Sequence, residues 1–304
     1  MASAPCSPAG QTPGVQWDEM QQPHGREKME PLTIIQLSDT HLQPEGQLLH
    51  GTIDSWQRTE QALEAVAYLE PDAIVVTGDI ADRGSPIHER AAELFNRTQR
   101  VLDCPVISVP GNHDPLGTVG ESFNTRRLST GPRPADTVHE VHGLRIIGLD
   151  SGGFQLAQGN LEREQLDWLS MLLAAPAPRG SLLLLHHPPV EATNEARAGR
   201  GLQNPMELAA ITAGSDIRAI LCGHYHQAST SQLVNTPVFM APAVSYNMNP
   251  FAPTQIVAEP AAAFNVINVG AKTVDAFAAS SDQCSALNEC PALPAPVKSS
   301  QTSN

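Results

Sequence analysis

The chain has 304 residues, which allows one large domain or two small ones and is long enough to bury a core. It carries 18 Lys and Arg against 32 Asp and Glu, a formal net charge of −14 with histidine neutral. This acidic balance repels a phosphate backbone, so we expect neither a nucleic-acid polymer as partner nor a polybasic membrane anchor. Hydrophobic residues make up 41% and aromatics only 4%, so Leu, Val, Ile and Ala should dominate the core.

The sequence predicts no transmembrane segment, because no apolar run approaches the ~18 residues that a membrane span needs. The first thirty residues lack the basic start and apolar stretch of a secretory signal. The five cysteines are an odd number, and Cys104 and Cys222 lie in or beside apolar runs, where a reduced thiol packs as a small hydrophobe. We therefore expect a cytoplasmic protein.

Composition divides the chain into three parts. Residues 1–31 are rich in Pro, Gln and Gly and are predicted to form a disordered arm. Residues 278–304 carry few large apolar side chains and are predicted to form a disordered tail. The folded domain is expected at 32–277.

Short apolar runs alternate with helical patterns along the predicted domain. The runs predict strands, in chain order, at Leu32–Leu37, Ala73–Thr77, Val106–Val109, Leu144–Leu149, Ser181–His186, Ile217–Cys222, Gln232–Met240 and Phe264–Val269. Helices are predicted at Ser55–Leu69, from the Ser85-Pro86 pair to about Arg100, after Asn160 as N-cap, and after the Asn204-Pro205 pair. This alternation favours a layered α/β fold with much parallel pairing.

Histidines and short polar residues cluster directly after the predicted strands. In chain order the clusters are Asp39-Thr40-His41, Gly78-Asp79, Gly111-Asn112-His113-Asp114, His186-His187 and Gly223-His224-Tyr225-His226. Ligands of open α/β sheets bind at the carboxyl ends of the strands, where loops converge. We therefore expect these five blocks to meet at one site.

The residue types in these blocks are typical of metal ligands. Two Asp, one Asn and four His offer oxygen and nitrogen without thiolate, which suits Mn, Fe, Zn or Co. Seven ligands are more than one tetrahedral ion uses, whereas two ions that share a bridging carboxylate account for them. Each residue alone could be a helix cap, a turn residue or a buried structural histidine.

The five blocks, in this order, resemble the calcineurin-like metallophosphoesterase superfamily. The segments Gln36–Leu42 and Asp216–His224 resemble most the bacterial class III cyclic-nucleotide phosphodiesterases, over about residues 32–270. The resemblance implies a central β-sandwich of two mixed sheets flanked by helices (α/β/β/α). It also implies two metal ions per chain and a homodimer.

The resemblance also implies a role for each site residue. The first metal would be held by Asp39, His41, Asp79 and His226, and the second by Asp79, Asn112, His186 and His224. His113 would be the catalytic residue, and Asn112, His113 and His224 would bind the substrate. Asp82 and Asp114 either orient a ligand by hydrogen bonding or cap a turn. His187 is expected to point away from the metals, because adjacent residues of an extended strand face opposite sides.

The function implied is hydrolysis of a 3′,5′-cyclic nucleotide such as cAMP to the nucleoside monophosphate, with a metal-bridging hydroxide as nucleophile. Alternatives are a glycerophosphodiester or broad-specificity phosphodiesterase or phosphatase of the same fold, and a non-catalytic regulatory binding protein. A purple acid phosphatase is disfavoured, because Asp82 stands where those enzymes carry a tyrosine. Substrate choice is expected to lie in loops 114–140, 151–160 and 188–204 and in the C-terminal segment.

Overall fold

A computed structural model describes residues 30–82, 87–115, 128–152 and 156–286. The chain divides into Met1–Glu30 and Pro31–Asn304, and all regular elements described below belong to the second unit. The arm expected at 1–31 lies outside the described residues except for Glu30 and Pro31.

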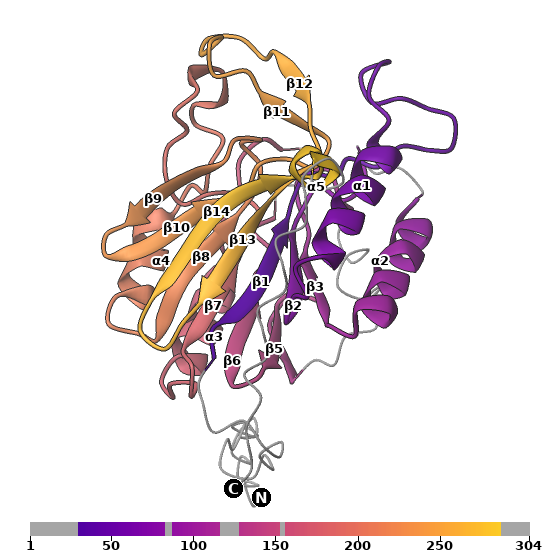
Figure 1. Cartoon of the computed structure of the whole chain (residues 1–304). Helices are drawn as coiled ribbons and strands as arrows, with labels where there is room; N and C mark the ends of the chain where they lie inside the picture. Colours follow the sequence, from indigo (N-terminus) through magenta and orange to yellow (C-terminus); the bar gives the residue numbers. More distant parts are fainter. Residues whose placement is uncertain (1–29, 83–86, 116–127, 153–155, 287–304) are drawn as a thin grey trace, which may run out of the picture. The chain divides into compact units, whose positions relative to one another are not determined.

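The first sheet has the strand order β14-β13-β1-β2-β3 (Figure 1). Its strands are β1 (Leu32–Leu37), β2 (Ala73–Thr77), β3 (Val106–Val109), β13 (Ala263–Val269) and β14 (Val274–Ser280). The three N-terminal strands pair in parallel, whereas β13 pairs antiparallel with both β1 and β14. The sheet is therefore mixed.

The second sheet has the order β4-β5-β6-β7-β8-β10-β9. Its strands are β4 (Ser129–Thr130), β5 (Thr137–Val141), β6 (Leu144–Gly148), β7 (Ser181–Leu184), β8 (Ile217–Cys222), β9 (Ser229–Leu233) and β10 (Thr236–Met240). The pairs from β6 through β7 and β8 to β10 are parallel, and the outer pairs are antiparallel. A separate hairpin joins β11 (Tyr246–Met248) to β12 (Ala258–Pro260).

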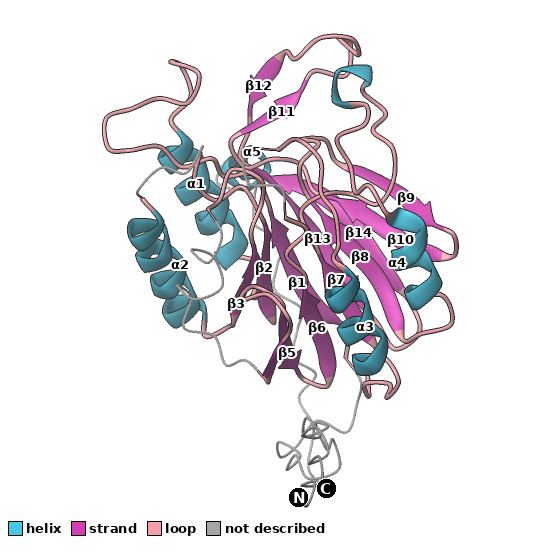
Figure 2. Cartoon of the chain, turned by 180° about the vertical axis from the view of Figure 1, so that it is seen from behind, coloured by secondary structure: helices cyan, strands magenta, loops and turns pink. Residues whose placement is uncertain are grey.

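Helices cover the outer face of each sheet (Figure 2). The first sheet carries α1 (Ser55–Ala67), α2 (His88–Leu102) and α5 (Ser281–Ala286), and the second carries α3 (Arg163–Leu172) and α4 (Pro205–Thr212). A short 3₁₀ helix, η2, covers Glu195–Arg197. Within the described ranges, none of the helices combines the length and apolarity needed to cross a bilayer.

Alternate residues of the strands serve two different cores. Ile34 of β1 packs between the two sheets, whereas its neighbour Ile35 packs against the helices on the outer face. Strands buried on both faces are nearly continuous apolar runs, which is why they were visible in the sequence. The α/β/β/α arrangement of two mixed sheets flanked by helices is thus confirmed.

Several predicted boundaries are wrong. The strand expected at Gln232–Met240 is a hairpin, because Val234 takes a left-handed φ of 56° between β9 and β10. The third helix is capped by Glu162 instead of Asn160, and Gln165 Oε1 accepts a bond from the Glu162 N–H at 2.9 Å. The start expected at Ser85-Pro86 lies outside the described residues, and α2 begins at His88.

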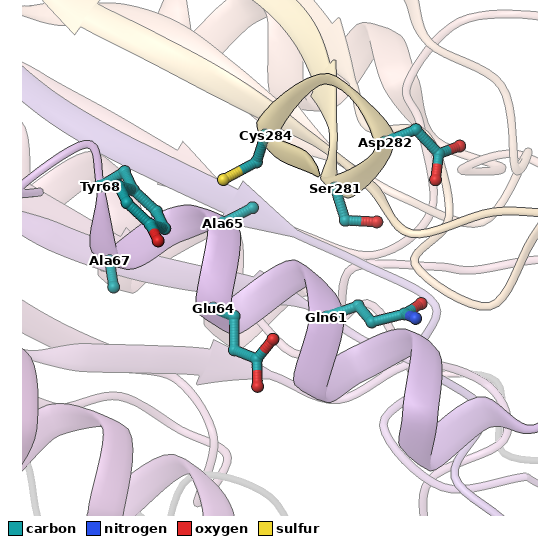
Figure 3. A pocket seen from close by; sticks show the side chains of 8 residues that line it. All are labelled: Gln61, Glu64, Ala65, Ala67, Tyr68, Ser281, Asp282 and Cys284. Atoms are coloured by element: carbon teal, nitrogen blue, oxygen red, sulfur yellow. The ribbon is translucent and has the colours of Figure 1, made fainter. Parts of the chain in front are cut away.

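Regular structure continues past residue 277, where the predicted domain was expected to end. β14 continues to Ser280 through backbone pairing with β13, and α5 extends to Ala286 beside α1. Composition missed this segment because a strand paired along its backbone at a sheet edge needs few large apolar side chains. A pocket of about 430 Å³ separates α5 from α1, and the residues that line it come from these two helices and their ends (Figure 3).

A buried ion pair ties β6 to the start of β8. The fully buried Arg145 guanidinium donates to both carboxylate oxygens of Asp216, at 2.7 and 2.9 Å. It also donates to Ser181 Oγ at 2.7 Å and to the backbone oxygens of Leu172 and Ala175. The positive charge of the buried Arg145 is therefore paired with the Asp216 carboxylate.

We expect Asp216→Ala to destabilise the protein by about 3–5 kcal/mol, because it leaves the Arg145 charge buried without its partner. Denaturant unfolding of the full chain measures the change. Asp167→Ala is the matched control, since it breaks the exposed Arg163–Asp167 pair and should leave the midpoint nearly unchanged. Equal midpoints for the two variants would contradict the prediction.

Candidate functional site

The five polar blocks of the sequence lie just beyond five parallel strands. Asp39 follows the last residue of β1 by two positions and Asp79 follows β2 by two. His186 lies two residues beyond β7, which ends at Leu184 and is thus shorter than the predicted strand. The parallel strands deliver all five blocks to the same edge of the sandwich, as the sequence predicted.

One cluster of side-chain atoms brings Asp39, His41 and His226 together. His226 Nε2 lies 3.1 Å from Asp39 Oδ1 and 3.2 Å from His41 Nε2. Asp79 Oδ2 lies 3.6 Å from His41 Nε2 and completes the group. All four residues are buried.

A second cluster is built around His186. Its Nε2 atom lies 3.1 Å from His224 Nδ1, 3.3 Å from Asn112 Oδ1 and 3.4 Å from Asp79 Oδ2. The same oxygen of Asp79 therefore belongs to both clusters. The seven residues predicted as ligands thus form two groups of four that share one carboxylate oxygen.

Backbone carbonyls hold three of the imidazoles from behind. Each of these rings points one nitrogen into its cluster and the other nitrogen at a carbonyl oxygen, to which it can only donate. The acceptors are Thr77 O for His186 Nδ1 (2.7 Å), Tyr246 O for His226 Nδ1 (2.9 Å) and Ala157 O for His224 Nε2 (3.0 Å). These bonds favour the tautomer whose lone pair faces the cluster.

The carboxylates are oriented in the same way. Asp79 Oδ1 accepts from the His113 N–H at 2.8 Å, and Asp39 Oδ2 accepts from the His224 N–H at 3.0 Å. The opposite oxygens, Asp79 Oδ2 and Asp39 Oδ1, face the clusters. Backbone donors therefore decide which oxygen is offered to a cation.

The backbone at the site is strained. Left-handed φ angles between 42° and 71° occur at five of the seven ligand candidates: Asp39, His41, Asp79, His224 and His226. Such angles are uncommon for residues other than glycine and persist where the surroundings fix them, as at functional sites. Here the Asp39 and His41 N–H groups donate to Gly78 O and Asp79 O, at 3.0 and 2.9 Å.

Two glycines allow the blocks to approach one another. A Cβ atom on Gly111 would collide with Asp79 Oδ1 and the Asp79 backbone nitrogen. A Cβ atom on Gly223 would collide with Ser38 Oγ. Any side chain at either position would push the two blocks apart.

The surroundings of Asp39 and Asp79 favour the ionised form of both carboxylates. Burial acts to raise the pKa of Asp79, but the surrounding imidazoles, His186 foremost, hold it well below its usual range. Burial opposes ionisation of Asp39 too, and His226 keeps the pKa of that carboxyl low. For His186 burial favours the neutral ring, yet Asp79 and Asp39 raise its pKa to about 9, so a cation that binds its Nε2 must displace a proton.

The two clusters fit metal ions. Two ligand atoms that share an ion at ~2.1 Å lie ~3.0–3.4 Å apart at common coordination angles, which matches the contacts of His226 and of His186. Asp39 Oδ1 is buried and makes no hydrogen bond. A carboxylate oxygen buried in this way is costly unless a cation pairs with it.

His113 lies beside the clusters and is itself only partly buried, with 25% of its side chain exposed. Its Nδ1 lies 2.8 Å from Asp82 Oδ1, and its Nε2 lies 4.0 Å from Asp79 Oδ2. Asp82 Oδ1 also lies 3.4 Å from His41 Nδ1, so the same carboxylate oxygen is close to two histidines. Burial lowers the pKa of His113, but the bond to Asp82 and the charge of Asp79 outweigh it and raise the pKa.

We expect Asp82→Asn to lower the pKa of His113 in the metal-free protein, because the imidazolium loses a charged acceptor. NMR titration of the His113 ring measures this value. The raised pKa makes the imidazolium stabilise the folded state at acidic pH, and this contribution is lost as pH rises through the folded-state pKa. Asp275→Asn, an exposed change on β14, is the control, and an unchanged titration in Asp82→Asn would contradict the assignment.

Asp114 clamps two of the blocks together. Its carboxylate accepts from the N–H groups of Ile80, Ala81 and Gly111 at 2.9–3.1 Å. His88, the first residue of α2, lies 3.2 Å from Asp114 Oδ1. Asp82 contacts the ligand candidate His41, which agrees with the reading that it orients a ligand. The bonds from Ile80, Ala81 and Gly111 to Asp114 fix the loops next to Asp79 and Asn112 instead.

The structure brings further residues to the site. His187 does not point away from the site: its ring lies 4.7 Å from the ring of His224, and its Nδ1 lies 2.7 Å from the buried Ser151 Oγ. It lies in a bend instead of a strand, which removes the basis for the expected alternation. Tyr246 and Arg197 also lie nearby, and neither stands in a motif that the sequence offered.

Comparisons with known proteins assign the family. Residues 32–228 match the family model described as calcineurin-like phosphoesterase. A "probable cyclic nucleotide phosphodiesterase" of Rhodococcus erythropolis is 36% identical over 71% of this chain and 72% of its own length. A "cAMP/cGMP dual specificity phosphodiesterase" of Mycobacterium tuberculosis is 35% identical over 71% and 68%. A "probable glycerophosphodiester phosphodiesterase" of Arcobacter nitrofigilis is 30% identical over 75% and 86%.

The chain belongs to the calcineurin-like phosphoesterase family. It is therefore a metal-dependent phosphoesterase, as the five motif blocks implied. Among solved structures, a dimetal phosphatase from Danio rerio superimposes with a TM-score of 0.52 over 81% of this chain and 98% of its own, at 13% identity. That likeness supports the fold alone.

Proposed function

We propose that this phosphoesterase hydrolyses small phosphodiesters, with 3′,5′-cyclic nucleotides such as cAMP as its substrates. The observation that carries the proposal is the single oxygen, Asp79 Oδ2, shared by two groups of four ligands. Metal ions held by these residues would supply a nucleophilic hydroxide at neutral pH and would stabilise the charge that develops in the displacement at phosphorus. The donor set suits Mn, Fe, Zn or Co.

The chain's own residues would complete the reaction. Asp39, His41, Asp79 and His226 would hold one ion, and Asp79, Asn112, His186 and His224 the other. His113, held by Asp82 with its other nitrogen near the shared oxygen, is placed to protonate the leaving oxygen or to steady the phosphoryl charge. Asn112 and His224 would also contact the substrate.

The relatives support the substrate class. Two of them carry names that specify cyclic-nucleotide phosphodiesterases. Another is named for glycerophosphodiester cleavage, and this observation keeps a glycerophosphodiester or broad-specificity enzyme as the second candidate. A non-catalytic regulator is disfavoured, because every predicted ligand and His113 are present.

A substrate panel tests the proposal. The Mn-loaded enzyme is assayed for kcat/KM with 3′,5′-cAMP, 2′,3′-cAMP, a glycerophosphodiester and p-nitrophenyl phosphate. We expect the cyclic diesters to lead. A monoester preference above tenfold would overturn the diesterase, and a glycerophosphodiester preference would select the second candidate. Less than one metal per chain and no turnover of bis-p-nitrophenyl phosphate would indicate the regulator.

Two further features belong to the proposal. Cys104 and Cys222 are free, buried thiols, which supports a reducing cytoplasmic compartment. The homodimer, the arm at 1–31 and the C-terminal tail stay predictions. Sedimentation of the full chain tests the dimer.

A further inference from the structure

Arg197 of η2 is a buried cation close to the site. Only 8% of its surface is exposed, although it lies in the loop 188–204 that connects β7 to α4. Its Nε is buried without a hydrogen-bond partner, and Nη2 contacts Met248 Sδ at 3.9 Å, a weak acceptor. Among the residues that the structure describes, no carboxylate forms an ion pair with it.

The surroundings of Arg197 connect it to the first ligand cluster. Its guanidinium interacts with the Tyr246 side chain, where it partly offsets the rise in the tyrosine pKa that burial causes. The Tyr246 ring in turn lies 4.3 Å from the ring of His226. The positive charge of Arg197 also adds to the lowering of the pKa of His226 and His224, for which burial is the main cause.

The backbone fixes Arg197 in this place. Asn194 caps η2 by accepting from the Ala196 N–H at 2.9 Å, and Asn194 O accepts from the Arg197 N–H at 2.9 Å. The same Ala196 N–H lies 3.2 Å from Pro253 O in the loop between β11 and β12. The arginine is thus held between two loops and does not lie on a free surface.

A buried guanidinium without an acid is costly, and this one also lies near a site proposed to hold two cations. An anion bound between the guanidinium and the proposed cations would pair with the guanidinium and would reduce the repulsion between the positive charges. A phosphodiester carries that charge on its two non-bridging oxygens, which match the donor fork of arginine.

We infer that Arg197 is a substrate-binding residue, whose guanidinium donates to a non-bridging phosphoryl oxygen of the diester. The inference rests on the proposed function and names a contact that the sequence motifs do not contain. Because the phosphoryl group keeps its negative charge from ground state to transition state, the contact should act mainly on binding. The product phosphate group should use the same contact.

The test compares Arg197→Met with Arg200→Met in the Mn-loaded full chain. Arg200 lies in the same loop, and no described side chain forms a hydrogen bond or an ion pair with it. The Arg200→Met variant therefore controls for the loss of one positive charge. For Arg197→Met we expect KM for bis-p-nitrophenyl phosphate and Kd for inorganic phosphate, by calorimetry, to rise ~10- to 100-fold together. We expect kcat within ~3-fold and metal content unchanged, with Arg200→Met like wild type.

A KM and a phosphate Kd both within ~2-fold of wild type would overturn the inference, and so would an equal rise in Arg200→Met. A fall in kcat with unchanged phosphate Kd would also overturn it. If Arg197→Met does not fold, Arg197→Gln is judged by the same two constants and thresholds. Because phosphate binding needs no turnover, the phosphate Kd tests Arg197 even if the wild type hydrolyses no diester and the proposed function fails.

Discussion

Asp79→Ala should lower kcat for bis-p-nitrophenyl phosphate by at least ~10³-fold, equivalent to a rise of ~4 kcal/mol in the barrier. Asp79 Oδ2 faces His41 at 3.6 Å and His186 at 3.4 Å, so its removal takes one donor from each cluster at once. Asp79 Oδ1 accepts from the His113 N–H, so the loop that carries His113 also loses a hydrogen bond in the variant. Asp79 therefore contributes to three features of the site.

Metal analysis accompanies the kinetic measurement. We expect Asp79→Ala to retain less than one ion per chain after reconstitution with Mn²⁺ and dialysis, whereas the wild type retains two. Asp275→Ala, an exposed change on β14, is the control for folding and should match the wild type in both measurements. Two bound ions together with a kcat within tenfold of wild type would show that the shared oxygen is not a bridge.

His113→Ala should lower kcat by ~10²–10⁴-fold while both metals stay bound. The side chain stands outside both groups of four, and its Nε2 lies 4.0 Å from the shared oxygen. If His113 protonates the leaving oxygen, the loss should be larger for a diester with a poor leaving group, such as cAMP, than for bis-p-nitrophenyl phosphate. An electrostatic role alone would affect the two substrates equally.

The control for His113→Ala is His142→Ala. His142 is 57% exposed and lies in the turn between β5 and β6. It should leave kcat and metal content at wild-type values. A metal-free His113→Ala protein would contradict the separation between the ligands and the proton donor.

The sequence predicted the central strands well because both of their faces are buried. Runs such as Leu32–Leu37 and Ile217–Cys222 match the strands residue for residue. β5 and β14 were not predicted, because Thr137–Val141 and Val274–Ser280 contain no long apolar run. Backbone pairing with a neighbouring strand holds them in place. Strands of this kind are defined by their partners, and a single sequence does not show which segments pair.

The same reasoning explains which site residues could be found. Asp79 and His186 follow apolar strands that fix their position, so a pattern of strand followed by ligand locates them. Arg197 comes from a loop of small and charged residues, and only the fold shows that it is buried beside Tyr246. His88 is similar, because its contact with Asp114 joins a helix to a loop 26 residues away.

The left-handed backbone at five of the seven ligand candidates has a consequence for which metal the protein carries. Bonds within the protein, such as Asp39 N–H to Gly78 O and His41 N–H to Asp79 O, help to hold these angles. We therefore expect the donors to form a preformed template in which one ion can replace another without rearrangement of the chain. A template of oxygen and nitrogen donors accepts several first-row ions, with affinities that follow their intrinsic order. We expect cells supplied with different metals to yield enzyme of different metal content and the same fold.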